Sequence, residues 1–385
     1  MFRISQYMQE LSTPREPGPK QNPPAPVVIW NLIRRCNLTC KHCYSISTDR
    51  DFPGELNTAE IFAVMDDLKR FRVPVLILSG GEPLLRPDLF EIARRAKSMG
   101  FYVGLSSNGT LIDAANIDRI AECDFDYVGV SLDGIGATHD KFRQMPGAFA
   151  ASLQGIRLCR DLGLKIGVRF TMTQDNAQDL PELLRLVEDE GIDRFYFSHL
   201  NYAGRGNKNR SDDAQHRLTR WAMDLLFDTC LDYQQRGLHK EFTSGNNDAD
   251  GVYFLHWVHQ RYPQQAANIR ARLVQWGGNS SGVNVANIDN LGNVHPDTMW
   301  WHYSLGNVRQ RPFSEIWMDL SDPLLAGLKQ FPRSVSGRCG ECRHFDICNG
   351  NARVRAQQLT GDPWAEDPGC YLADEEIGVT PGRER

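Results

Sequence analysis

The sequence predicts an α/β protein in which a partial (βα)6 barrel of the TIM type is followed by a small, cysteine-bearing C-terminal domain. Six short apolar runs recur through residues 27–200, and helical periodicity fills the intervals between them. The final hundred residues are turn-rich and carry four of the ten cysteines. A hydrophobic content of 41% and a charged content of 24% are ordinary for a globular chain of 385 residues.

The six predicted strands are rich in β-branched and aromatic residues. They span residues 27–30, 75–78, 102–105, 127–131, 166–170 and 195–199. Because these runs are nearly continuously apolar, we expect a parallel sheet covered by helices. Six units instead of eight would leave the barrel open on one side, with room for a large substrate. Functional residues should gather at the C-terminal ends of the strands.

The predicted helices have apolar residues at helical spacing. They span residues 58–71, 87–98, 113–122, 148–162 and 176–190. Asn57 is the expected N-cap of the first helix, and Glu60 three residues later would complete a capping box.

The regular pattern has flanking regions on both sides. Before it, residues 1–26 form an extension with an apolar patch, one short helix at most, and a proline-rich stretch. After the barrel core (27–200) we expect a connecting region (201–280) and the C-terminal domain (281–385). The connecting region holds a basic loop, a helix at 212–236, a polar turn at 243–250 and an aromatic stretch at 253–262.

The composition excludes several classes of function. A net charge of −5 and a pI of about 6.1 give no reason to expect a nucleic acid or an anionic membrane as partner. No run of about 18 apolar residues occurs, and the N-terminus lacks a signal-peptide core, so we expect a cytoplasmic protein. Because the cytosol keeps thiols reduced, the cysteines indicate metal sites or buried thiols instead of disulfides.

Three cysteines follow the first predicted strand. Cys36, Cys40 and Cys43 form the pattern C-x3-C-x2-C, so one loop can present three thiolates to one corner of a cluster. Cubane iron–sulfur clusters normally take four cysteine ligands, and a local set of three leaves one iron open. From the triad alone, the alternatives are a zinc site short of one ligand and chance clustering.

This triad resembles the signature of the radical SAM superfamily. The resemblance implies that the three cysteines hold a catalytic [4Fe–4S] cluster whose open iron binds S-adenosylmethionine (SAM). Reductive cleavage of SAM there would supply a 5′-deoxyadenosyl radical. The family usually has an aromatic residue just before the third cysteine, near the adenine; here that position is His42, a planar ring that could stack in the same way.

A glycine–glutamate turn, Gly80, Gly81 and Glu82, follows the second strand. Paired glycines let the backbone approach a ligand closely, and a carboxylate beside them can accept hydrogen bonds from an ammonium group. In the superfamily the matching segment receives the amino group of SAM. The alternative is a strand-to-helix turn with a solvated glutamate.

Polar residues also end strands three and four. Ser107 and Asn108, then Ser131 and Asp133, place groups where a ribose could be hydrogen-bonded. With Arg143 they resemble the SPASM-type subgroup of the superfamily, in which a serine and an arginine in these regions contact SAM. The matching residues here are Ser131 and Arg143, whereas Asn108 and Asp133 could equally be turn residues.

Five residues are candidates for substrate binding. Arg169 alternates with apolar neighbours on strand five and would point into the barrel, where it needs a substrate carboxylate or a structural Asp or Glu. His199 lies at the end of strand six. It could be a proton donor, a metal ligand or a hydrogen-bonded wall residue. Arg205, Lys208 and Arg210 place three cations on the next loop, which suits an acidic substrate or simple solvation.

Four cysteines near the C-terminus form a second set. Cys339, Cys342, Cys348 and Cys370 are enough to close a cluster without an open iron, or to bind a structural zinc. Their spacing resembles the second auxiliary-cluster motif of SPASM domains, which implies an auxiliary [4Fe–4S] cluster and an iron–sulfur domain. Ala352 replaces a further cysteine of that motif, so we expect one auxiliary cluster, suited to electron transfer or substrate orientation.

The resemblance covers nearly the whole chain and is closest to the NirJ family of haem d1 biosynthesis. The segments VIWNLIRRCNLTCKHCYS, NYAGRGNK and ARVRAQQLTGDPWAEDPGCY carry it. It implies removal of propionate side chains from didecarboxysirohaem, a tetrapyrrole, with a ferredoxin or flavodoxin as electron donor.

Composition and spacing by themselves indicate no tetrapyrrole, so two alternatives remain. The first is another SPASM-type enzyme, such as a peptide maturase or a haem-pathway decarboxylase. The second is a non-catalytic iron–sulfur or zinc scaffold protein, which would not need the glycine–glutamate turn.

Overall fold

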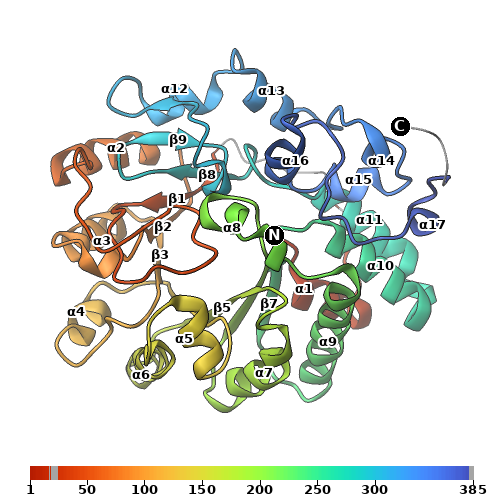
Figure 1. Ribbon diagram of the computed structural model, residues 1–385, viewed down its shortest axis with the longest axis horizontal. Helices are drawn as coiled ribbons and strands as arrows, with labels where there is room; N and C mark the ends of the chain where they lie inside the picture. The colour runs from red at the N-terminus through yellow and green to blue at the C-terminus, as the bar shows by residue number, and fades with distance from the viewer. Residues whose placement is uncertain (17, 19–24, 381–385) are drawn as a thin grey trace.

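The computed structural model describes residues 1–16, 18 and 25–380, whose strands form one ten-stranded sheet (Figure 1). The order is β10-β9-β8-β1-β2-β3-β4-β5-β6-β7; β8 and β1 to β7 pair in parallel, and β9 and β10 are antiparallel. The strands are β1 (Val27–Asn31), β2 (Val75–Ser79), β3 (Tyr102–Ser107), β4 (Tyr127–Ser131), β5 (Ile166–Met172), β6 (Arg194–His199), β7 (Glu241–Gly245), β8 (Val285–Ile288), β9 (Asn293–His295) and β10 (Gly306–Asn307). All six predicted strands are present, which confirms the α/β fold class.

Helices surround the strands (Figure 1). They are α1 (Ile4–Ser12), α2 (Thr58–Arg70), α3 (Leu89–Ser98), α4 (Ile117–Glu122), α5 (Ala137–Arg143), α6 (Ala148–Asp161), α7 (Leu180–Asp189), α8 (Gly204–Lys208), α9 (His216–Gln235), α10 (Ala249–Arg261), α11 (Ala266–Trp276), α12 (Phe313–Met318), α13 (Pro323–Lys329), α14 (Gly337–Gly340), α15 (Phe345–Cys348), α16 (Arg353–Thr360) and α17 (Asp374–Ile377). The predicted capping box of α2 is confirmed: Asn57 Oδ1 accepts from the Glu60 amide at 3.0 Å, and Glu60 Oε2 accepts from the Asn57 amide at 2.8 Å.

The sheet continues past the six predicted strands on both sides. β7 lies in the predicted connecting region, where its last three residues fall in the stretch 243–250 predicted as a polar turn, and it pairs in parallel with β6. Its first residue is a glutamate and its last a glycine, so its sequence does not have the apolar pattern of a strand. β8, from the predicted C-terminal domain, pairs in parallel with β1. Both flanking regions therefore contribute to the same sheet as the barrel core.

The N-terminal extension packs against the barrel. Its apolar patch is buried (Phe2, Ile4, Tyr7, Met8 and Leu11). Phe2 forms a backbone bridge with Ser244 on β7, and α1 contacts α9. The single predicted short helix is therefore present, while much of the proline-rich stretch (17 and 19–24) lies outside the described residues.

The sheet curves, so side chains of non-adjacent strands meet on its inner face. Tyr102 on β3 accepts a hydrogen bond from Arg194 on β6 at 3.1 Å, although β4 and β5 lie between these strands. On the β1 and β2 side, the inner-face residues Ile29 and Ile77 keep partial exposure, whereas their outer-face neighbour Trp30 is fully buried. The barrel interior is therefore accessible beside β1 and β2.

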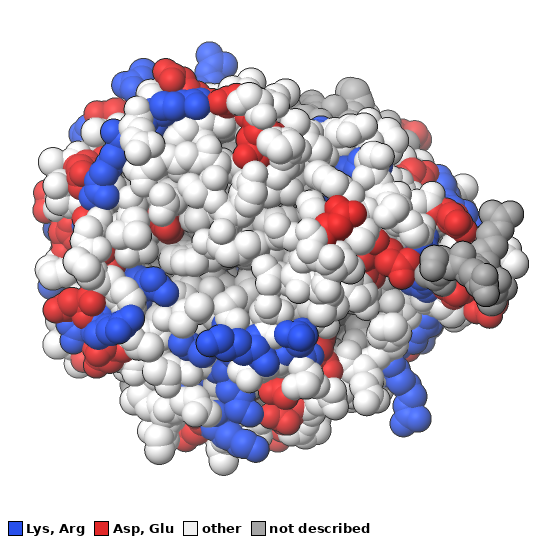
Figure 2. All heavy atoms as spheres, turned by 45° about the horizontal axis from the view of Figure 1, so that its top comes forward, with Lys and Arg blue, Asp and Glu red and all other residues white. Residues whose placement is uncertain are grey.

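The C-terminal segments form a separate group of short helices with its own small hydrophobic core. Trp300, Leu324, Leu328 and Val354 pack together there, separately from the main core. Among the described residues, no helix is both long and apolar enough to cross a membrane. On the face shown in Figure 2, uncharged side chains form the middle, and a row of Lys and Arg side chains runs below it.

Candidate active site

The cysteine triad lies in the loop that leaves β1 at its C-terminal end. Cys36 and Cys40 are buried, and Cys43 packs against them. Each sulfur has a polar neighbour. The Leu38 amide donates to Cys36 Sγ at 3.4 Å, Arg143 Nη1 donates to Cys40 Sγ at 3.5 Å, and the Ser45 hydroxyl lies 3.3 Å from Cys43 Sγ.

Burial shifts the pKa of two of these thiols. It raises the pKa of Cys36 to about 12, with Glu82 adding to the effect, and it also raises the pKa of Cys40. A buried thiol of this kind becomes a thiolate when a metal or a cation compensates the charge. The donors around the sulfurs are of the kind that stabilise cluster-bound thiolates.

Gly80 and Gly81 lie against the backbone of the cysteine loop. The Gly81 amide donates to the Ile33 carbonyl at 2.6 Å. A Cβ on Gly81 would lie 2.3 Å from the Arg35 carbonyl oxygen, and one on Gly80 would lie 2.4 Å from that of Ile33. The close backbone approach predicted from these glycines therefore exists, and the partner in this structure is the cysteine loop.

Glu82 is fully buried, unlike the solvated glutamate of the alternative interpretation. Its carboxylate accepts hydrogen bonds from the Ser107 hydroxyl at 2.9 Å, the Asn108 amide at 2.8 Å and the Leu84 amide at 3.2 Å. Burial raises the pKa of Glu82 to about 7, and these hydrogen bonds limit the rise. Glu82 thus joins the ends of β2 and β3 directly beneath the cysteine loop.

The Asn108 side chain continues this connection. Its Nδ2 donates to Asn37 Oδ1 at 2.9 Å and lies 3.9 Å from Cys36 Sγ, and its Oδ1 accepts from the Thr110 amide at 2.9 Å. Asn37 lies between two of the cysteines and was not singled out from the sequence. Its position next to Cys36 in the sequence is the signal from which its role could have been predicted.

Asp133 and Arg143 form a buried ion pair at the ends of β4 and α5. Asp133 also accepts from the Thr171 amide at 2.6 Å, and its own amide donates to His139 Nδ1 at 2.9 Å. Burial alone would raise the pKa of Asp133, but Arg143 holds it below its usual value. Arg143 Nε is buried and has no hydrogen-bond partner within the described chain. Ser131, at the end of β4, pairs in register with Arg169.

His42 lies between this pair and an aromatic ring. Its Nε2 is 3.9 Å from Asp133 Oδ2, and its ring centroid is 4.7 Å from that of Phe142. Burial lowers the pKa of His42 to about 4, so the ring is neutral at physiological pH.

The five substrate candidates have different surroundings. Arg169 is partly exposed and donates to the Ser106 hydroxyl on the inner face. Arg205 binds the cysteine loop instead of open solvent: its Nε donates to the Cys40 carbonyl at 2.7 Å and its Nη1 to the Ser47 carbonyl at 3.0 Å. Lys208 and Arg210 are exposed.

His199 faces away from the barrel interior. It shares the outer face of β6 with Phe197, and its Nε2 lies 3.0 Å from Asp250 Oδ2. The Tyr371 hydroxyl donates to the other oxygen of Asp250 at 2.8 Å. His199 is therefore a hydrogen-bonded wall residue, which links the barrel to the segment that carries Cys370. Sequence reasoning missed Asp250 and Tyr371, although Tyr371 directly follows a candidate ligand.

The four C-terminal cysteines come together as well. Burial raises the pKa of Cys348 well above its usual value, and the charges of Cys339, Cys370 and Cys342 add to this. The Asp367 amide donates to Cys339 Sγ at 3.4 Å, and the His344 amide to Cys342 Sγ at 3.3 Å.

Within residues 1–16, 18 and 25–380, no group of three or more His, Cys, Asp or Glu side chains is arranged to hold a single metal ion. A cubane cluster binds its cysteines on separate irons, so cluster ligands need not converge on one point.

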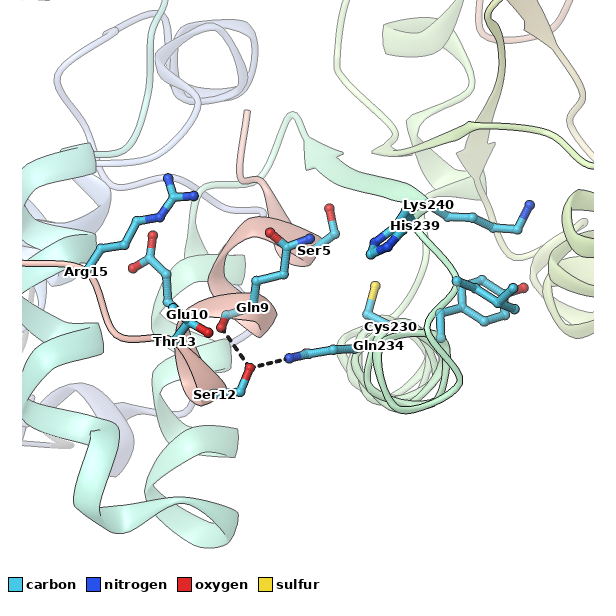
Figure 3. Close-up of a pocket in the computed structure, with 12 residues that line it drawn as sticks. Ser5, Gln9, Glu10, Ser12, Thr13, Arg15, Cys230, Gln234, His239 and Lys240 are labelled. Carbon is cyan, nitrogen blue, oxygen red and sulfur yellow. Dashed lines mark hydrogen bonds between the residues drawn. The ribbon is translucent and has the colours of Figure 1, made fainter.

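Two cavities lie apart from the cysteine loop. One of about 540 Å³ is near the N-terminal end of β7, where Figure 3 shows side chains of α1 facing Cys230 and Gln234 of α9. The other, of about 390 Å³, lies between the start of α9 and Gly369 and includes His199 in its wall. No cysteine of the triad or of the C-terminal set lines either cavity.

Comparison with known proteins identifies the family. A family model described as the radical SAM superfamily matches residues 30–187. The chain is 55% identical to a pre-heme d1 synthase of Dinoroseobacter shibae, over 100% of this chain and 96% of that protein. It is 46% identical to an Fe-coproporphyrin III synthase of Methanosarcina barkeri, over 92% of this chain and 89% of that protein.

A solved structure, Streptococcus suis SuiB bound to S-adenosylmethionine, matches with a TM-score of 0.70 at 16% identity, over 91% of this chain and 78% of that one. This likeness supports the fold. The relatives at 55% and 46% identity and the matching family model lead to one conclusion: the chain belongs to the radical SAM superfamily, whose enzymes use S-adenosylmethionine and a [4Fe–4S] cluster.

Proposed function

We propose that this chain is a radical SAM enzyme of haem d1 biosynthesis that removes propionate side chains from didecarboxysirohaem. The observation that carries the proposal is the 55% identity to a pre-heme d1 synthase over 100% of this chain and 96% of that protein. A tetrapyrrole is therefore the proposed substrate, a ferredoxin or flavodoxin the proposed electron donor, and the cytoplasm the proposed location.

Cys36, Cys40 and Cys43 are the proposed ligands of the catalytic cluster. Their sulfurs lie beside the Leu38 amide and the Arg143 guanidinium, which fits thiolate ligands that accept N–H hydrogen bonds. When bound, the cluster and SAM supply a 5′-deoxyadenosyl radical, which removes hydrogen from an unactivated carbon. The protein's part is to position the reacting groups and to exclude water.

Glu82 is the proposed acceptor for the amino group of SAM. Its carboxylate already accepts three hydrogen bonds, and an ionised carboxylate offers about four acceptor sites, so one remains for an ammonium group. Gly80 and Gly81 hold this carboxylate against the cysteine loop.

The other proposed SAM contacts lie around the same loop. Arg143 has a buried Nε without a partner in the described chain, which suits a carboxylate, and His42 offers a neutral ring for the adenine. The proposed ribose contacts are Ser107, Asn108, Ser131 and Asp133.

Cys339, Cys342, Cys348 and Cys370 are the proposed ligands of one auxiliary [4Fe–4S] cluster. The amide–sulfur hydrogen bonds to Cys339 and Cys342 and the mutual proximity of the four thiols support this assignment. In this proposal, residues 27–200 hold the catalytic cluster and residues 281–385 hold the auxiliary cluster. From residues 201–280, Arg205 donates to the Cys40 carbonyl in the triad loop, and Arg220 on α9 donates to the Tyr371 carbonyl beside Cys370.

The test is anaerobic reconstitution with SAM, dithionite and didecarboxysirohaem, followed by mass analysis of the tetrapyrrole. We expect the mass loss of whole propionate side chains, accompanied by 5′-deoxyadenosine. The 46% identity to an Fe-coproporphyrin III synthase keeps a second haem-pathway candidate, a decarboxylase, under test. A propionate that such an enzyme turned into a vinyl group would lose carbon dioxide and two hydrogen atoms, one of them carried away on 5′-deoxyadenosine. An unchanged tetrapyrrole with deoxyadenosine formed would overturn both substrate assignments and leave the family intact.

A further inference from the structure

Small polar side chains form the inner face of the barrel at the C-terminal ends of the strands. They are Asn31, Ser79, Ser106, Ser131 and Ser198, from five different strands. Hydrogen bonds show that members of this layer face one another: the Ser79 hydroxyl donates to that of Ser106 at 3.5 Å. Arg169 on β5 belongs to the same layer and donates to the Ser106 hydroxyl from the opposite side.

Among the described residues, Arg169 has no carboxylate partner. None of the ion pairs formed within residues 1–16, 18 and 25–380 includes it, whereas the buried Arg143 and Arg355 are paired with Asp133 and Asp367. Its hydroxyl partner carries no charge. A guanidinium that is partly withdrawn from water gains most from an anionic partner.

Three phenols feel the charge of Arg169, and they stay protonated. Arg169 lies within electrostatic range of Tyr44, Tyr127 and Tyr196. Burial raises the pKa of Tyr196 to about 12 and also raises the pKa of the other two phenols. The protein therefore surrounds this cation with neutral hydroxyl groups.

Arg169 lies close to the proposed reaction site at the cysteine loop. It pairs in register with Ser131 at the end of β4, and its charge also reaches His42 in the cysteine loop. A ligand carboxylate bound at Arg169 would therefore lie inside the barrel, on the same edge of the sheet as the cysteine triad.

We propose that Arg169 and the hydroxyls around it form a carboxylate-binding subsite that takes one acidic side chain of the tetrapyrrole. By fixing that side chain inside the barrel, the subsite decides which propionate lies at the reacting position. Arg is suited to this because its planar fork binds a carboxylate bidentately. The inference rests on the proposed function and adds to it the residue that orients the substrate.

A carboxylate at Arg169 has two possible sources, the tetrapyrrole and SAM, and binding measurements separate them. The reconstituted wild type is compared with Arg169→Met and Arg169→Lys. The Kd of SAM is measured without tetrapyrrole, and the Kd of didecarboxysirohaem is measured by its visible absorption. Arg194→Lys is the matched control, because Arg194 also lies on the inner face but is already paired with Glu241 at 2.7 Å.

We expect Arg169→Met to raise the Kd of the tetrapyrrole roughly 10- to 100-fold and to leave the Kd of SAM within about twofold. Arg169→Lys should have an intermediate effect, and Arg194→Lys none. A rise in the Kd of SAM without a rise for the tetrapyrrole would assign the carboxylate to SAM and overturn the proposal. Unchanged values for both ligands would also overturn it.

Esterified substrate provides a second readout that does not depend on the stability of one variant. Wild type should bind the methyl ester of didecarboxysirohaem more weakly than the free acid, and Arg169→Met or Arg169→Lys should reduce that difference. If the difference is the same in all three proteins, the subsite is elsewhere. Failure of the proposed function would be distinguishable, because wild type itself would then neither bind nor convert the tetrapyrrole.

Discussion

The Arg143 guanidinium donates to the Cys40 sulfur at 3.5 Å and is held in that position by its buried ion pair with Asp133. The pair is almost completely withdrawn from solvent, with side-chain exposures of 8% for Arg143 and 1% for Asp133. Because a buried charge that loses its partner is strongly destabilising, this contact ties the stability of the β4 and α5 ends to the cysteine loop.

Replacing Arg143 therefore tests whether the pair supports the fold. We expect Arg143→Met to lower the free energy of unfolding by about 3–5 kcal/mol, because Asp133 would remain buried without its cation. Arg157→Met is the control, since Arg157 is half-exposed in its pair with Glu190, and it should cost less than about 1 kcal/mol. Equal denaturant midpoints for the two variants would contradict the assigned role.

The pH dependence of SAM binding follows from Glu82. Burial raises its pKa to about 7, so below that pH the carboxyl is protonated in the free protein and cannot attract an ammonium group. We expect the affinity for SAM to increase as pH rises from about 5.5 to 7, by up to tenfold per pH unit. Equilibrium dialysis should show that Glu82→Gln binds SAM more weakly and loses this slope. A slope that survives the substitution would assign the titration to another group.

Gly81→Ala tests the packing between the glycine turn and the cysteine loop. The added Cβ would lie 2.3 Å from the Arg35 carbonyl and 2.4 Å from that of Arg34, so the loop must shift. We expect reduced iron incorporation at the triad, measured as iron per chain after anaerobic reconstitution. Gly191→Ala is the control, because its Cβ would meet nothing within 4 Å and only the positive φ of 66° is strained. Normal iron content in Gly81→Ala would mean that the loop tolerates the displacement.

Variants of Arg205 and Lys208 test whether these cations support the cysteine loop or bind the substrate. Arg205 donates to the Cys40 and Ser47 carbonyls, so we expect Arg205→Met to lose iron from the triad faster than wild type, with an unchanged KM for the tetrapyrrole. Lys208 is exposed, and Lys208→Met should leave iron retention unchanged. A raised KM with normal iron retention in Arg205→Met would restore the substrate role that the sequence suggested.

Cys370→Ser tests the second cluster. We expect iron to fall from about eight to about four per chain, while 5′-deoxyadenosine formation without substrate persists and tetrapyrrole turnover is lost. Cys123→Ser is the control, because that buried thiol lies near the Phe90 carbonyl at 3.7 Å, far from the other cysteines in sequence. About four irons and one zinc in the wild type would contradict the auxiliary-cluster assignment.

Much of the barrel was predictable because its strands are local and apolar. The capping box of α2 depends on Asn57 and Glu60 alone, and it is present as predicted. β7 escaped prediction because its partners are remote: β6 on one side and Phe2 at the other end of the chain. Its five residues contain a glutamate and a glycine, so pairing rather than local propensity makes it a strand.

Prediction of the candidate site is limited in the same way, because partners remote in the sequence cannot be predicted from local pattern. The positions of Cys36, Cys40 and Cys43 follow from their spacing, but the partners of Glu82 and Arg205 come from other strands and loops. For His199, strand alternation was informative: it shares a face with Phe195 and Phe197, which are buried, and not with the inner-face Tyr196.

The most direct test of the central claim is the yield of 5′-deoxyadenosine from SAM and dithionite with anaerobically reconstituted protein. Wild type should form it, and Cys36→Ala, Cys40→Ala and Cys43→Ala should each form none above the level without protein. Retained deoxyadenosine formation in any of these three variants would contradict the assignment of the triad as the site of radical generation.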